Sequence, residues 1–388
     1  MLVNNSSLLV RIPQATVSLS AQLSCRSILV QIPVCALPKA IYTSLPNLAS
    51  FLPMAETAPT EEIGRLIADE IFSKFGWKQC GPYNQNFACV ELEMHRKKKA
   101  KSHPGDVIFR YPDPYLGLDV YLHTDLKSYA KSTIEKADLK TILRDVAITV
   151  DCANKSPSWT HLYDQTDGNH VVHGLLFIYN HDQEYDKAFP SVLQLIGDGV
   201  SQLPEGKRIF VIGPERALYL YNVASDITHL QGSQKLPFDD SISFFHPDLQ
   251  NTRIQTQKYG PATVEVLISP WQVLLHRDKS NRKLQHGHLI YYAGTGGTVE
   301  EFLYLLDYVF TYQLHDDEGT IQVRLPNGVS EAANIFEKAK VRYGQEYWSV
   351  QADSQHHFQE RLSRITCCLT PKRIPQLSTT EIGLKRNG

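Results

Sequence analysis

The stretch His103–Ser132, HPGDVIFRYPDPYLGLDVYLHTDLKSYAKS, places two acids and a lysine at the ends of two apolar runs. The runs DVIFRY and LDVYLHTDLKSY have the alternation and the β-branched and aromatic content that are typical of strands. Asp106 stands at the start of the first run, and Asp125 and Lys127 lie toward the end of the second. Charged groups normally avoid a sheet core, so these three side chains call for a functional explanation.

The chemistry of these three residues favours metal-dependent phosphodiester hydrolysis. Asp125 and Lys127 are two apart on a strand and so point to one face, while Leu126 points to the other. If Asp106 joins them, two carboxylates converge, which a divalent cation between them would make tolerable. Mg²⁺ or Mn²⁺ would accept their oxygens, and a lysine can position a metal-bound water and offset charge on the phosphate. The alternative is a strand cap beside a surface ion pair, worth about 0 to 1 kcal/mol.

The surrounding sequence predicts a mixed α/β sheet flanked by helices, followed by a second, smaller α/β unit. Thr60 caps an expected helix that Gly76 ends. Strands follow it, among them the two apolar runs described above, and after them comes an expected helix over 132–154. Then come the expected elements VVHGLLFIYN (strand), 189–200 (helix), RIFVIGP, ALYLYNV, TVEVLIS and HLIYYAG (strands), 299–312 (helix), TIQVRL (strand) and 330–343 (helix). The polar stretch 230–257 separates an expected domain over 55–229 from one over 258–370.

In this order of elements, the trio resembles the PD-(D/E)XK nuclease superfamily, whose restriction-endonuclease-like core runs helix, three strands, helix, strand. The resemblance implies that Asp106 is the first metal ligand and that Asp125 and Lys127 are the acid and lysine of the (D/E)XK motif. Gly105 separates Pro104 from Asp106, a departure of one residue from the usual Pro-Asp pair.

Many members of this superfamily add a glutamate from the first helix that supports the metal. Glu62 lies in the first turn of the expected helix, and Glu70 borders its apolar face and could look toward the sheet. Glu70 is slightly favoured, and both are predicted to contribute to catalysis.

The resemblance implies an endonuclease that acts on DNA more readily than on RNA, in restriction or anti-phage defence by analogy. Cutting both strands of a duplex needs two sites, so a homodimer or larger assembly is expected, possibly with a partner protein, and the C-terminal unit would serve recognition or assembly. Two alternatives stay open. The chain could be an inactive nucleic-acid-binding or assembly module with this fold, or an α/β enzyme of unrelated chemistry whose site lies near Gly294–Gly297.

A basic connector, HRKKKAKSH, immediately precedes the proposed site. We expect Lys97, Lys98, Lys99 and Lys101 to contact nucleic-acid phosphates, because such ridges bind the backbone by counterion release. The alternative is an ordinary solvated loop. His123 and Tyr129 flank the DLK run and could touch substrate, although packing is the commoner role of such residues.

The bulk composition sets further limits. The chain has 388 residues and a formal net charge of −2, so no global field draws it to polyanions and any such site must be local. Seven cysteines form no CxxC pair and no zinc-spaced Cys/His set, so neither a disulfide framework nor a zinc site is predicted, and a cytoplasmic location fits best. No membrane span is expected. The turn AGTGGTVEE lacks the Walker lysine and GxGxxG spacing, so no nucleotide cofactor is expected.

The first 53 residues contain no Asp, Glu or Gly, unlike the rest of the chain. A natural start at Met54 and a poorly ordered natural extension are equally plausible interpretations. A transit peptide is a third, which several prolines disfavour because they break an amphipathic helix. In each case residues 1–54 are expected to lie outside the fold.

Overall fold

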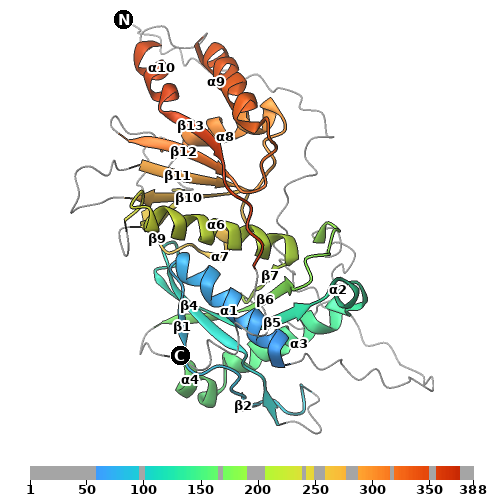
Figure 1. Ribbon diagram of the computed structural model, residues 1–388. Coiled ribbons are helices and arrows are strands. Elements are labelled where there is room, and N and C mark those ends of the chain that lie inside the picture. The colour runs from blue at the N-terminus through green and yellow to red at the C-terminus, as the bar shows by residue number, and fades with distance from the viewer. Residues whose placement is uncertain are drawn as a thin grey trace, which may run out of the picture.

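The computed structural model arranges two β-sheets and three sets of helices in alternating layers (Figure 1). One set of helices lies between the sheets, and the other two cover the outer faces. The described residues are 58–95, 101–164, 169–189, 206–237, 242–248, 258–276, 287–314, 319–348 and 355–375.

The first sheet has the strand order β1-β4-β5-β6-β7. Its strands are β1 (Lys78–Cys80), β4 (Val107–Asp113), β5 (Leu118–Tyr129), β6 (His170–Asn180) and β7 (Ile209–Ile212). The pairs β1–β4 and β4–β5 are antiparallel, whereas β5–β6 and β6–β7 are parallel. Two very short strands, β2 (Phe87–Ala88) and β3 (Ser102–His103), pair separately.

Helices cover both faces of this sheet. The helices before and between its strands are α1 (Ala58–Lys74), α2 (Lys131–Lys136), α3 (Leu139–Ala153) and α4 (Pro157–Tyr163). Helix α1 packs on the face that carries Leu122 and Leu126. Helices α3 and α4 pack on the opposite face, around Tyr121. A single strand therefore presents alternate residues to two different helical layers, as its period of two requires.

The second sheet has the order β13-β12-β11-β10-β8-β9. Its strands are β8 (Ile242–His246), β9 (Lys258–Gly260), β10 (Trp271–His276), β11 (Gly287–Tyr292), β12 (Thr320–Leu325) and β13 (Ile365–Leu369). Its outer face is covered by α8 (Val299–Thr311), α9 (Ala332–Trp348) and α10 (Gln355–Ser363). Residues alternate again: Leu289 and Tyr291 face the first sheet, while Ile290 faces α8.

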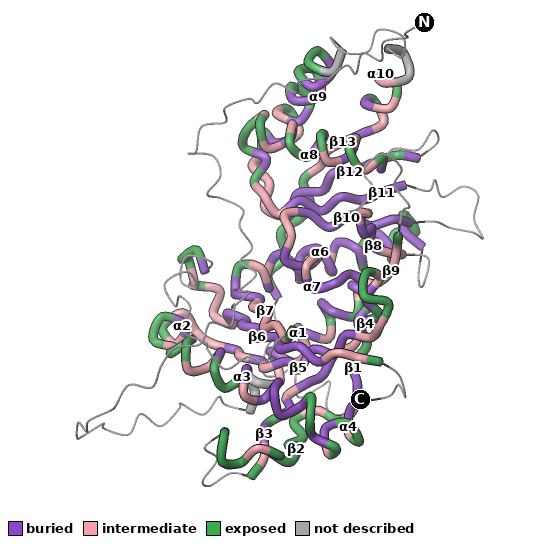
Figure 2. Tube along the Cα trace, turned by 180° about the vertical axis from the view of Figure 1, so that it is seen from behind, coloured by how far each residue is buried: buried purple, intermediate pink, exposed green. Residues whose placement is uncertain are grey.

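Helices α6 (Pro214–Gly232) and α7 (Val264–Ile268) lie with α1 between the sheets, and all three belong to one apolar core (Figure 2). A buried ion pair fastens this layer to the second sheet: Arg324 Nε and Nη2 donate to the two carboxylate oxygens of Asp226 at 2.6 and 2.8 Å. Tyr291 Oη donates to the same carboxylate at 2.8 Å. The two sheets thus share one core.

Several predicted elements are confirmed and two are wrong. ALYLYNV and TVEVLIS were expected to be strands, but they lie in α6 and α7. Both helices are enclosed by apolar neighbours, so their residues are apolar on several sides and show no clear helical period. The helix expected over 189–200 falls outside the described residues, except for Phe189.

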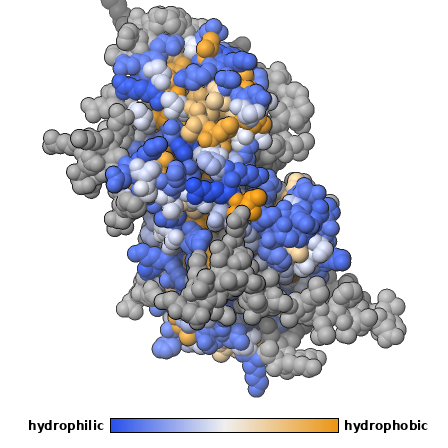
Figure 3. Space-filling model, in the orientation of Figure 1, coloured by the Kyte–Doolittle hydropathy of each residue, from blue (hydrophilic) through white to orange (hydrophobic). Residues whose placement is uncertain are grey.

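The predicted fold class, a mixed sheet flanked by helices with a further α/β unit, is confirmed. The first sheet uses strands before residue 213, and the second uses strands after 241, on either side of α6. The domain boundaries themselves stay a prediction. Across the described residues no helix is long and apolar enough to cross a membrane. The described surface is mostly hydrophilic on the face shown in Figure 3.

Candidate active site

Strand register brings Asp106 opposite Asp125. Val107 pairs with Thr124 in the antiparallel β4–β5 ladder, so the residue before β4 faces the residue after Thr124. The backbone N–H of Leu126 donates to Asp106 Oδ2 at 3.0 Å, which fixes that carboxylate against the edge of β5. The carboxyl groups of Asp106 and Asp125 are close enough for the charge of Asp125 to raise the pKa of Asp106, after burial, which is the larger cause. The convergence expected from sequence is therefore present.

Lys127 completes the group. Its Nζ donates to Asp125 Oδ1 at 2.5 Å, and both side chains are 23% exposed. Burial by itself would lower the pKa of Lys127, but the charges of Asp125 and Asp106 outweigh burial and raise that pKa. The ammonium group is thus held in its charged form beside the two acids.

The positive charge near Asp106 is too small to offset the burial of its carboxyl group and the charge of Asp125. Burial is the largest cause that raises the pKa of Asp106 well above its usual range, and the charge of Asp125 raises it further. Lys127 and the Leu126 N–H oppose these effects only in part. A divalent cation between the carboxylates would remove this repulsion, and their hard oxygen donors suit Mg²⁺ or Mn²⁺. The residues present therefore fit the metal that was expected.

His123 positions the segment that leads to Asp106. The ring is fully buried on the same face of β5, and its Nδ1 accepts from Trp159 Nε1–H at 3.3 Å. Nε2 lies 3.0 Å from the carbonyl oxygen of Pro104, to which it then donates. Burial is the main cause that lowers the pKa of His123 to about 4, so the ring is neutral. Of the two roles considered for His123, the structure shows packing and hydrogen bonding.

Packing explains why position 105, which departs from the family pattern, is a glycine. A Cβ at this position would lie 2.6 Å from Tyr163 Oη and 2.8 Å from the carbonyl oxygen of Gln85. Tyr163 Oη donates to that same carbonyl at 2.9 Å, and the Gln85 N–H donates to Gly105 O at 3.0 Å. Only glycine allows the chain to pass so close to α4 before it reaches Asp106. Tyr163 could not be predicted from the sequence, because nothing local marks a tyrosine on a distant helix as a neighbour of the site.

The glutamates of α1 do not join the group in the way expected. Glu70 is exposed, whereas Ala68, Ile71 and Phe72 form the buried face of the helix, so the expectation that Glu70 looks toward the sheet is wrong. Glu62 is largely covered and pairs with Arg65 within the same helix. Since α1 packs on the opposite face of β5 from Asp125, neither glutamate gains support as a metal ligand from its position.

The other predicted contacts have separate outcomes. Lys101 is exposed, in agreement with a role at the surface, but Lys97, Lys98 and Lys99 lie outside the described residues. The turn at Gly294–Gly297 leads into a capped helix: Thr298 accepts from the Glu301 N–H, and Glu301 Oε2 accepts from the Gly296 N–H at 3.0 Å. A carboxylate already occupies the place where a phosphate would bind, which supports the interpretation of this turn as a tight connection.

Residues 54–216 match the sequence family described as GAPS4 protein PD-(D/E)XK nuclease domain. The matched segment contains the whole first sheet, the carboxylate pair and Lys127, and it ends at the start of α6. No curated protein and no solved structure matches the chain.

Proposed function

Since residues 54–216 belong to the PD-(D/E)XK nuclease superfamily, we propose that the chain is a metal-dependent endonuclease whose catalytic residues are Asp106, Asp125 and Lys127. The observation that carries the proposal is the convergence of two carboxylates and one ammonium group at the β4–β5 edge. The raised pKa of Asp106 supports it, because burial and the charge of Asp125 both disfavour the ionised carboxylate, and a bound cation would favour that ionised form.

Each of the three side chains has a task in phosphodiester hydrolysis. Asp106 and Asp125 would bind Mg²⁺ or Mn²⁺, and Leu126 N–H keeps the Asp106 carboxylate oriented. When bound, the cation would lower the pKa of a water molecule and neutralise charge on the phosphate. The ammonium group of Lys127 lies beside Asp125. From that position it can orient the attacking water and stabilise the pentavalent phosphate.

We propose DNA as the preferred substrate, on the strength of the resemblance alone, and the expected role in restriction or anti-phage defence has the same basis. Cleavage of both strands would require a second copy of the site, hence a homodimer or larger assembly. The second sheet with its helices lies outside the matched segment and would serve target recognition or assembly.

Cleavage assays test the proposal directly. Purified full-length chain is incubated with supercoiled plasmid, linear duplex DNA and RNA, each with Mg²⁺, Mn²⁺ or EDTA. We expect metal-dependent cleavage that Asp125→Asn and Lys127→Ala each reduce by at least about 100-fold, the scale of losing a group that acts in the transition state. A preference for duplex DNA over RNA would support the proposed substrate.

Matched variants separate charge loss from loss of the site. Asp119→Asn removes an acid from the same strand, where it pairs with Arg110 at 3.5 Å, and Lys131→Ala removes a lysine just beyond the strand. Both should keep wild-type cleavage. Activity that survives Asp125→Asn would refute the assignment of the site. Absence of cleavage by the wild-type chain on all substrates, with binding retained, would instead favour the non-catalytic module.

A further inference from the structure

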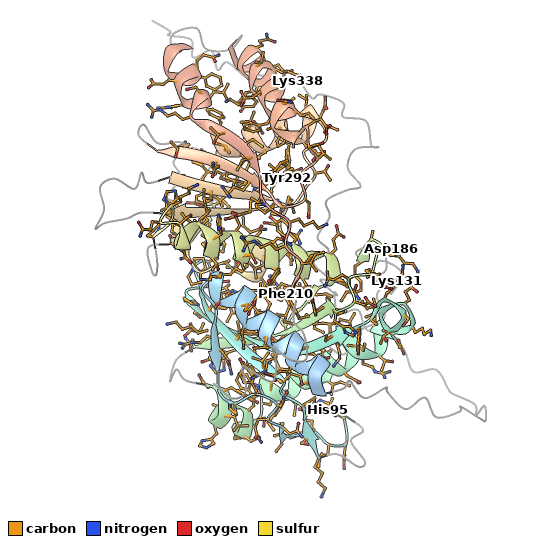
Figure 4. All side chains as sticks on the ribbon, viewed as in Figure 1. His95, Lys131, Asp186, Phe210, Tyr292 and Lys338 are labelled. Atoms are coloured by element: carbon orange, nitrogen blue, oxygen red, sulfur yellow. The ribbon has the colours of Figure 1, made fainter. Side chains whose placement is uncertain are left out.

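Two cysteines and two histidines meet at the end of the molecule away from the second sheet, where Figure 4 labels His95. Cys89 follows β2, His95 ends the next turn, His103 lies in β3 and Cys152 lies in α3. One potential ligand atom from each residue lies within 4.8 Å of those of the other three. We propose that these four residues bind one structural zinc ion. The inference does not depend on the proposed nuclease activity.

The geometry suits tetrahedral zinc. Bonds of about 2.3 Å to sulfur and about 2.0 Å to nitrogen place neighbouring ligand atoms about 3.3 to 3.8 Å apart. Cys89 Sγ and His95 Nδ1 are 3.3 Å apart. Cys89, His103 and Cys152 are buried, and the His95 side chain is 5% exposed. Four protein ligands with no access for water make a closed site, which is the property of structural rather than catalytic zinc.

The groups around His95 orient its ring for a metal. His95 Nε2 lies 3.3 Å from Asp151 Oδ2 and 3.7 Å from Glu91 Oε2, so it donates its proton on the carboxylate side. Nδ1 then carries the lone pair that points toward Cys89. A carboxylate behind the ligating histidine is the usual outer partner in zinc sites. Lys155 Nζ contacts both carboxylates, at 2.7 Å from Glu91 and 3.0 Å from Asp151, and offsets their charge.

Hydrogen bonds also orient the other ligands. Thr149 Oγ1 donates its one proton to the Asp145 carbonyl at 2.8 Å, so it accepts from His103 Nδ1 at 3.4 Å. That tautomer leaves the lone pair of His103 on Nε2. The Val90 N–H donates to Cys152 Sγ at 3.2 Å, and such a bond stabilises a thiolate.

The ligand set selects zinc over harder ions. Two sulfurs and two imidazole nitrogens in a closed group of four favour zinc, whereas Mg²⁺ and Ca²⁺ require oxygen ligands. Glu91, His95 and Asp151 also lie within mutual reach, but Lys155 already pairs with both acids and offsets part of their charge, which suits them to the outer shell. Cys89 and Cys152 are free thiols in the structure, so both are available as ligands.

The proposed zinc would fasten a weak hairpin to a helix. Strands β2 and β3 pair over only two residue pairs, and so short a hairpin has little stability of its own. Three ligands come from this hairpin and its connection, and Cys152 comes from α3. In sequence, the basic residues 96–101 lie between the ligands His95 and His103, and Asp106 follows three residues after His103. Zinc would therefore fix the approach to the first catalytic acid.

Metal analysis of the full chain tests the proposal. Protein purified without chelators should contain about one zinc ion per chain by plasma mass spectrometry. Cys89→Ser and Cys152→Ser should each lower that content by about tenfold or more. Cys80→Ser is the matched control, because Cys80 lies in the same apolar cluster but outside the set of four, and it should keep the zinc. Asp125→Asn should also keep it, which separates this ion from one at the active site.

Cobalt and histidine variants give a readout that is independent of folding defects in the serine variants. Chain stripped of zinc and loaded with Co²⁺ should show tetrahedral ligand-field bands and thiolate-to-cobalt charge transfer. His95→Cys should retain metal, since it supplies another ligand, whereas His95→Gln should lose it. Asp151→Asn should weaken zinc affinity by about 10- to 100-fold while leaving the four ligands in place.

Three outcomes would overturn the proposal. The first is wild-type chain from zinc-supplemented cells that contains no zinc and gives no thiolate band with cobalt. The second is a zinc content that stays at the wild-type level in both Cys89→Ser and Cys152→Ser. An intact mass lower by two hydrogen atoms, restored by reduction, would show that these cysteines form a disulfide instead.

Discussion

Replacement of Lys127 by methionine should destabilise the fold, not only abolish cleavage. The variant leaves Asp106 and Asp125 facing each other without their cation. Breaking a fully buried ion pair costs about 3 to 5 kcal/mol, but here both side chains of the Lys127–Asp125 pair are 23% exposed and solvent screens them. We therefore expect the free energy of unfolding to fall by about 1 to 3 kcal/mol in metal-free buffer at neutral pH. Urea titrations followed by tryptophan fluorescence would measure it.

The destabilisation should also depend on pH and on metal. Because the pKa of Asp106 is raised, the folded state holds a proton that the unfolded state releases at mildly acidic pH. Stability contributed by that proton is present at low pH and is lost as pH rises through the raised pKa. Lys127→Met should therefore cost least under acidic conditions. Millimolar Mg²⁺ should restore part of the loss at neutral pH, because the ion replaces the missing charge.

A double-mutant cycle makes the reasoning refutable. Asp125→Asn removes the repulsion on Asp106, so the double variant with Lys127→Met should regain about 1 to 2 kcal/mol relative to additive losses. Lys131→Met is the control: its partner Asp186 is 70% exposed, so solvent screens this pair and the substitution should change stability far less than Lys127→Met does. Additivity within about 0.5 kcal/mol in the Lys127–Asp125 cycle would show that these charges do not act on each other as proposed.

Three further predictions follow from other parts of the structure. Asp226→Ala should lower the free energy of unfolding by about 3 to 5 kcal/mol, since it leaves Arg324 buried without its bidentate partner, and urea titration would show it. Burial is the main cause that lowers the pKa of His173 from 6.5 to about 4. The contribution of this ring to stability is therefore full above pH 6.5 and falls by about 3 kcal/mol as pH drops through this window, and urea titrations over the same range should show that His173→Gln removes this contribution. Gly105→Ala should cost about 1 to 3 kcal/mol in urea titrations and reduce cleavage. Adding Tyr163→Phe to this variant should restore neither, because the new Cβ would still lie 2.8 Å from the carbonyl oxygen of Gln85.

Strand parity is the part of the site that local sequence could predict. Residues two apart on a strand share a face whatever surrounds them, so Asp125 and Lys127 had to lie together once β5 was recognised. The acid at the start of β4 followed from the order of elements. By contrast, α6 was mistaken for a strand because burial between two sheets removes the polar face that normally reveals a helical period.

Contacts between distant segments were beyond the reach of the sequence. The buried face of α1 excludes Glu70, although this residue borders the apolar face in the sequence, because the orientation of a helix on a sheet is set by all its neighbours. The need for glycine at 105 comes from Tyr163 on α4, which no local pattern connects to it.

The sequence alone determined the sheet edge that carries Asp106, Asp125 and Lys127, because backbone alternation and element order are local properties of the chain. Only the tertiary structure decided which face of that sheet each helix covers and which cysteines and histidines meet. Cys152 lies far along the chain from Cys89, His95 and His103, so no ligand spacing could reveal the cluster. Folding of α3 against the β2–β3 hairpin brings them together, since ligand geometry depends on distance in space and not on separation in sequence.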